Sequence, residues 1–207
     1  IRPRDEPLRL AIHGSEVYDH VPGIGKTATA LVESGIVRPE MTLQFEPLSS
    51  ERNKPVTARV RSVQLTRGHF ATPGIPMDEG EPRQLIGIAL KNLSEKDSLR
   101  ELFKGRGVLA GTTDDPPSVA RTMELELTVF DPDTLLRLGE IVTMHAHVDR
   151  VPVQIDEISH KRHKDDAEWE ATPGEEAIAP GEWGRVKVSV ATRPVAIEPA
   201  SILPTLS

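Results

Sequence analysis

Residues 123–129, MELELTV, place an apolar side chain at every second position and a polar one between. The apolar members are Met123, Leu125, Leu127 and Val129. Residues 185–190 (RVKVSV) and 41–46 (MTLQFE) repeat the pattern. Because successive side chains of a strand point to opposite faces, each stretch predicts a strand with one buried and one solvent-facing side, as antiparallel sheets require.

Shorter strand-like runs recur along the chain, with Gly, Pro, Asn or Asp between them. They are residues 8–12, 56–65, 85–90, 141–148 and 151–158. Only residues 94–103 (SEKDSLRELF) carry apolar residues at helical spacing, after a serine that can cap a helix. Many short strands separated by turn residues predict an all-β sandwich or barrel.

Composition excludes several classes of protein. The 207 residues hold 25 Lys and Arg against 32 Asp and Glu, a net charge of −7, so the basic excess of a free-standing nucleic-acid binder is missing. Without cysteine the chain has no disulfide, thiolate zinc site or cysteine nucleophile, which permits an intracellular location. No apolar run is long enough to span a membrane. The chain begins with Ile1 rather than Met, which indicates a fragment or a processed product.

A domain boundary is predicted at residues 112–118 (TTDDPPS), because two adjacent prolines favour an extended, semi-rigid connector. The expected domains are residues 1–111 and 119–207. Residues 160–181 are charged and contain Pro and Gly, which predicts a solvated loop. Its basic start, residues 160–164, either touches phosphate or forms a solvated hairpin tip.

Residues 23–27 (GIGKT) look like the end of a phosphate-binding loop. The full motif needs a glycine five residues before the Gly-Lys pair, where this chain has His20. The residues after the turn are strand-like, with no helix N-terminus to hold an anion. We therefore interpret the segment as a glycine-rich hairpin that binds no nucleotide.

His145 and His147 (HAH) are two residues apart, which puts them on one face of a predicted strand, opposite its apolar residues. With nearby histidines and acids they form either a metal site or a solvated, partner-facing pair, and no compact ligand motif supports the metal. The acidic pairs and the serines lack the surroundings of a hydrolase site.

Three blocks of the sequence resemble the second and third domains of the elongation factor 1-alpha and Tu family of translational GTPases. They are residues 8–38, which contain Glu-Ser-Gly and Arg-Pro-Glu where the family has Glu-x-Gly and Pro-Gly; residues 87–117, with GIALKNLSEKD, RGVLAG and DDPP; and residues 186–201. The resemblance covers nearly the whole chain. It implies two consecutive antiparallel β-barrels, the second without its last strands.

The resemblance also implies a binding site. In the family the second domain holds the aminoacylated 3′ end of tRNA. Gln64 matches a Glu that packs on the terminal adenine, Leu85 matches an Asn that helps hold the aminoacyl group, and Arg106 matches an Arg at the far wall. His145 and His147 would face the T-stem or another partner.

On this hypothesis the chain is a tRNA- and partner-binding part of a cytoplasmic elongation factor, and not an enzyme by itself. GTP and magnesium would bind a separate N-terminal domain, so no cofactor is expected in these residues. The ribosome and a nucleotide-exchange factor are further expected partners, and a membrane is not. The alternatives are a rescue or termination paralogue that binds a release-factor-like protein, part of a sulfate-activating GTPase, and a plain interaction module.

Overall fold

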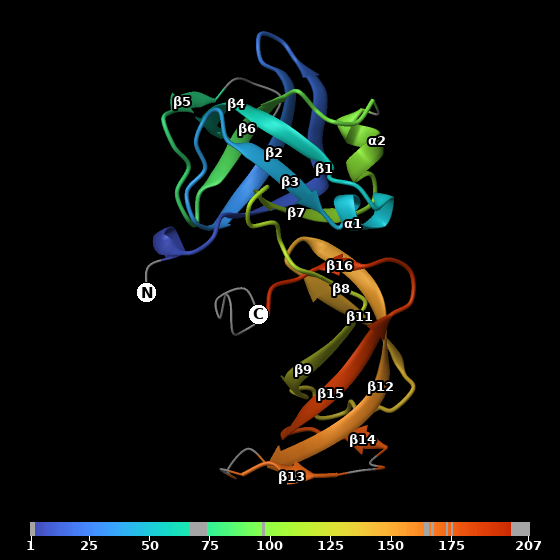
Figure 1. Ribbon diagram of the computed structural model, residues 1–207. Coiled ribbons are helices and arrows are strands. Elements are labelled where there is room, and N and C mark those ends of the chain that lie inside the picture. Colours follow the sequence, from blue (N-terminus) through green and yellow to red (C-terminus); the bar gives the residue numbers. More distant parts are fainter. Residues whose placement is uncertain are drawn as a thin grey trace. The chain divides into compact units, whose positions relative to one another are not determined.

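The computed structural model describes residues 3–199, apart from 67–73, 97, 164–165, 167, 173 and 175. The chain forms two compact units, which Figure 1 shows as ribbons. Unit 1 is Ile1–Val119 together with His145–Arg150 and Pro194–Ser207, and unit 2 is Ala120–Met144 together with Val151–Arg193. The predicted connector, residues 112–118, is part of unit 1, and so is the short segment His145–Arg150 from the expected second domain.

Unit 1 is built on one antiparallel sheet that closes on itself. Its strands are β1 (Arg9–Val21), β2 (Gly25–Ser34), β3 (Thr42–Glu46), β4 (Thr57–Leu65), β5 (Ile75–Met77), β6 (Leu85–Lys91) and β7 (Gly107–Thr112). They lie in the order β3-β7-β1-β2-β6-β4-β5, and an additional β3–β4 pairing closes the first six of this order into a barrel. The all-β, antiparallel class predicted from the alternation is confirmed.

Alternating apolar residues fill this barrel. Leu10, Ile12, Phe45, Ile86 and Ile88 are all fully buried in one cluster. The Phe45 and Phe103 rings meet edge to face with centroids 5.4 Å apart, an arrangement that aromatic pairs favour. The core thus accounts for the period-2 pattern of the strands that surround it.

Two short helices and the 3-10 turn η1 (Pro3–Asp5) complete unit 1. Helix α2 (Leu99–Phe103) begins later than the predicted residue 94, because the Ser98 hydroxyl accepts the Glu101 N–H and caps the helix there. Helix α1 (Leu48–Arg52) was not predicted. Residues 22–24 form the turn between β1 and β2, and β2 begins at Gly25, which pairs with Val21, so the predicted hairpin is confirmed.

The strands that follow β7 in the sequence form the remaining sheets, and most of their residues belong to unit 2. These strands are β8 (Val119–Ala120), β9 (Thr122–Thr128), β10 (Leu136–Arg137), β11 (Ile141–Ala146), β12 (Asp149–His163), β13 (Glu170–Ala171), β14 (Ala177–Ile178), β15 (Glu182–Val190) and β16 (Val195–Ala196). One sheet has the order β11-β12-β15-β9, with β13 on β12, and β10-β14 and β16-β8 form two small sheets. The predicted loop at 160–181 is wrong in part, because β12 runs to His163 and both β13 and β14 follow.

Candidate binding face of unit 1

Gln64 and Leu85 lie on neighbouring strands and face the same way. Gln64 of β4 pairs with Gly87 of β6, and Leu85 lies two residues before Gly87 on the same side of the strand. The intervening Ile86 and the neighbouring Val63 are fully buried in the barrel, so Gln64, Gly87 and Leu85 point outward. The structure therefore brings two of the three predicted pocket residues together.

Gly87 leaves this outward face bare, although nothing local requires a glycine. Its φ is not in the left-handed region. Among the described residues, a Cβ added there would meet only Thr66 Cγ2 at 3.9 Å and the Gln64 carbonyl oxygen at 4.0 Å, which are ordinary contacts. Glycine weakens the interior of a strand and often marks a place where a ligand approaches the backbone closely. Sequence reasoning did not identify Gly87 as a site residue. The feature that could have identified it is a glycine inside a run of apolar strand residues.

The polar and apolar groups around Gly87 are complementary. The Gln64 Oε1 accepts the Gly74 N–H at 2.9 Å, which fixes the amide and leaves its NH₂ group without a partner in the described part of the chain. Leu85 is 43% exposed and offers an apolar surface beside it. Together these groups can contact a flat apolar group and donate a hydrogen bond to an acceptor attached to it.

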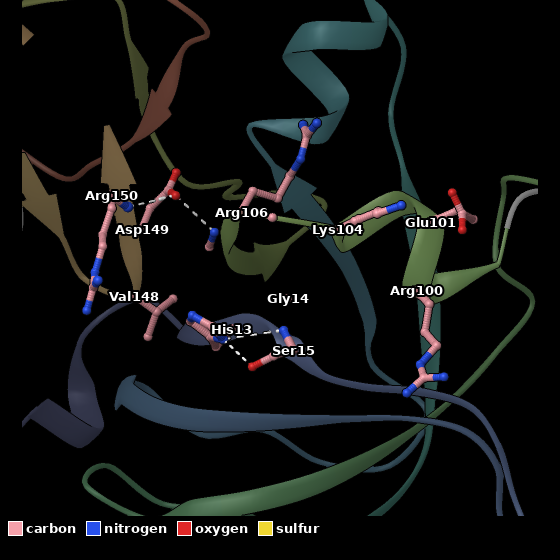
Figure 2. Close-up of a pocket in the computed structure, with 12 residues that line it drawn as sticks. His13, Gly14, Ser15, Arg100, Glu101, Lys104, Arg106, Val148, Asp149 and Arg150 are labelled. Carbon is pink, nitrogen blue, oxygen red and sulfur yellow. Dashed lines mark hydrogen bonds between the residues drawn. The ribbon is translucent and has the colours of Figure 1, made fainter. Parts of the chain in front are cut away.

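Arg106 does not join Gln64 and Leu85. It precedes β7, and β1 and β2 lie between β7 and the strand that carries Leu85. Its guanidinium forms an ion pair with Glu51 of α1. Figure 2 shows this guanidinium directed away from His13, on the wall of a separate hollow. The structure thus brings Gln64 and Leu85 together and places Arg106 on a different part of the barrel.

The two predicted histidines also differ in their surroundings. His145 is exposed in β11, but that strand ends at Ala146, and His147 lies in the following turn with φ +52°. The expectation that both share one strand face is therefore wrong. His147 is half-buried, and its Nε2 has no hydrogen-bond partner. Burial lowers the pKa of His147, against a smaller opposing effect of the Glu198 carboxylate.

The described residues offer neither a clustered metal site nor a phosphate loop at residues 23–27. They contain no group of three or more His, Asp or Glu placed to hold a metal ion. Within the same ranges, no helix is long and apolar enough to cross a membrane. The hairpin at 23–27 lacks the helix that a phosphate loop needs.

Comparison with known proteins finds relatives among the elongation factors 1-alpha. No family model matches. Elongation factor 1-alpha of Pyrococcus horikoshii is 31% identical over 163 residues, which are 77% of this chain and 34% of that protein. The factor of Thermococcus sibiricus is 29% identical over 209 residues, which are 99% of this chain and 44% of that protein. A crystal structure of Sup35 complexed with GDP superposes with a TM-score of 0.74 at 13% identity, covering 98% of this chain and 43% of that one.

The closed antiparallel barrel of unit 1 and the all-β second unit, taken with these relatives, place the chain among the β-barrel proteins of translation. More particularly, it belongs to the translation elongation factor family, as a relative of elongation factor 1-alpha that corresponds to its two C-terminal domains. The chain spans about a third to under half of the length of these relatives.

Proposed function

We propose that the outward face of β4 and β6 receives the aminoacylated 3′ end of a tRNA, and that the chain is the tRNA-binding part of an elongation factor 1-alpha-like GTPase. The observation that carries the proposal is Gly87, a strand glycine that neither backbone conformation nor packing among the described residues requires. Its absent side chain leaves room beside Gln64 and Leu85 for a flat ligand.

In this proposal, Gly87, Leu85 and Gln64 each contact a different part of the RNA end. The terminal adenine lies over the bare backbone at Gly87 with its edge against Leu85, since apolar contact suits a purine. The Gln64 NH₂ donates a hydrogen bond to an acceptor on the ribose or the ester. Arg106, which is paired with Glu51, and the half-buried His147 have no part in this contact.

Affinity in this proposal is weak and salt-sensitive. The net charge is −7, from 25 Lys and Arg against 32 Asp and Glu, so the chain as a whole repels an RNA backbone, and salt weakens the phosphate contacts that individual cations make. GTP hydrolysis, magnesium, the ribosome and an exchange factor belong to the proposed activity of the whole cytoplasmic protein. No step of that activity is assigned to the residues described here.

The test compares an aminoacylated RNA minihelix with the same RNA deacylated, by fluorescence anisotropy at low salt. Tighter binding of the charged form is expected. The double variant Gln64→Ala, Leu85→Asn removes the NH₂ donor and the apolar contact; since the hydrogen bond alone is worth about 1 kcal/mol, affinity for the charged RNA should fall about fivefold or more. Leu138→Asn, at an exposed leucine of unit 2, is the matched control and leaves binding unchanged. Equal binding of the charged and uncharged RNA contradicts the proposal.

A further inference from the structure

A second hollow lies in unit 1, on a different part of the barrel from Gln64 and Leu85. Its volume is about 610 Å³, within the range typical of small-ligand sites. The walls come from the middle of β1, from α2 with the turn after it, and from the segment that begins β12. All of its lining residues belong to unit 1.

Cations dominate the side chains of this hollow. Arg100, Lys104 and Arg150 line it, and none of the three has an ion pair or side-chain hydrogen bond with a described residue. Elsewhere in unit 1, arginines such as Arg4 and Arg38 are paired with acids. Lys26 and Arg83 of unit 1 also have no ion pair with a described residue, so what distinguishes the hollow is that three such cations gather around it.

The hollow's acids compensate this charge only in part. Asp149 is buried, and its Oδ1 already accepts the N–H groups of Gly107 at 3.0 Å and Arg150 at 2.9 Å. Arg106 is balanced by Glu51 outside the hollow. Glu101 is exposed, and in Figure 2 it points away from His13. A net positive charge remains at this surface.

His13 adds a further donor. The Ser15 N–H donates to the His13 Nδ1 at 3.3 Å, and the Ser15 hydroxyl lies 2.6 Å from the same nitrogen. With Nδ1 used as an acceptor, the neutral ring carries its proton on Nε2, which can donate to a ligand. Figure 2 shows Arg150 and Arg100 on opposite sides of the hollow, with His13 and Ser15 between them.

We infer that this hollow binds the phosphate groups of an extended ligand. A surface of hydrogen-bond donors with unpaired positive charge is complementary to phosphate oxygens. Because the cations are spread across the hollow, they suit several linked phosphates better than a single one. Such phosphates are supplied either by a free polyphosphorylated molecule or by a nucleic-acid backbone. This site is separate from the face at Gly87 and does not depend on the function proposed for that face.

The test titrates tripolyphosphate into the ¹⁵N-labelled chain and follows the amide resonances. Binding with a Kd of about 1 mM or tighter is expected, with shifts at His13, Ser15 and Gly105. The double variant Arg100→Gln, Lys104→Gln changes exposed residues and weakens binding about tenfold. Arg121→Gln, Lys187→Gln removes the same charges from exposed positions of unit 2 and leaves binding unchanged.

A short single-stranded RNA distinguishes the two sources of phosphate. If the RNA binds and tripolyphosphate displaces it, the hollow takes backbone phosphates; if tripolyphosphate binds and the RNA does not compete, the ligand is a free molecule. Three results overturn the inference: no binding, equal weakening by the two double variants, or shifts confined to residues outside the hollow.

Discussion

Replacing Gly87 by valine separates binding from folding at the proposed tRNA face. A strand glycine with only a structural role is required either by its backbone conformation or by close packing against its Cα. Replacing such a glycine destabilises the fold. Gly87 meets neither condition, since an added Cβ would have only ordinary contacts at 3.9 and 4.0 Å with described residues. Valine should therefore be accepted by the strand while it covers the bare surface beside Gln64.

The expected magnitude follows from the intrinsic preference of strands. Glycine inside a strand costs about 0.5–1 kcal/mol relative to alanine, and a β-branched residue adds to the gain. Gly87→Val should therefore raise the free energy of unfolding by about 1 kcal/mol, which corresponds to an increase in Tm of about 2–4 °C for a chain of this size. Its affinity for the aminoacylated minihelix should fall about tenfold or more, because the branched side chain occupies the volume proposed for the adenine.

Urea unfolding followed by circular dichroism and anisotropy with the charged minihelix give the two readouts. Gly14→Ala is the contrasting control: its Cβ would lie 1.9 Å from the backbone oxygen of Phe103, so this variant should lose about 3 kcal/mol or more of stability. A Gly87→Val protein that is less stable than the wild type, or that binds the charged RNA equally well, would refute the reasoning.

Three further predictions concern stability. Glu198→Gln should lower the unfolding free energy by about 3 kcal/mol in urea titrations, because it removes the buried carboxylate beside the Arg9 guanidinium and leaves only the more exposed Asp115 carboxylate at 3.5 Å. An unchanged midpoint would show that the buried pair is dispensable. Burial lowers the pKa of His147, so the folded state holds this ring neutral and loses stability as the pH falls below the ordinary pKa of histidine. His147→Asn should therefore lose less stability than the wild type between about pH 7.5 and pH 5. An identical loss in the two proteins would contradict this prediction. Glu40→Gly should not lower the urea midpoint, because glycine relieves the φ of +71° while the ion pairs that are lost are exposed; a clear decrease would mean that these pairs hold the turn.

The strands could be predicted because alternation follows burial, although the apolar residues of β9 (Met123, Leu125 and Leu127) are only half-buried. Val186 and Val188 of β15 are buried, as their spacing requires. The short helix α1 could not be predicted, because five residues carry too little periodicity to separate a helix from a turn. Glu40, which stands where the family resemblance has a glycine, adopts the left-handed conformation that such a glycine would favour.

The candidate site was accessible to sequence reasoning only in part. Gln64 and Leu85 were predicted to act together, and the register of β4 and β6 places them on one face, while their role in binding stays a prediction. Arg106 was misplaced because the order of strands around a barrel depends on long-range pairing that local sequence does not encode. His147 was misplaced because a strand can end one residue before the alternation does.

Mapping the aminoacylated minihelix on the ¹⁵N-labelled chain tests the central claim most directly. The account predicts that the amide resonances of Gln64, Leu85 and Gly87 shift with the charged RNA, that these shifts are largely absent with the deacylated RNA, and that Gly87→Val abolishes them. Shifts of the same size with both RNAs, or shifts that leave β4 and β6 unaffected, would contradict the claim that this face holds the aminoacylated end.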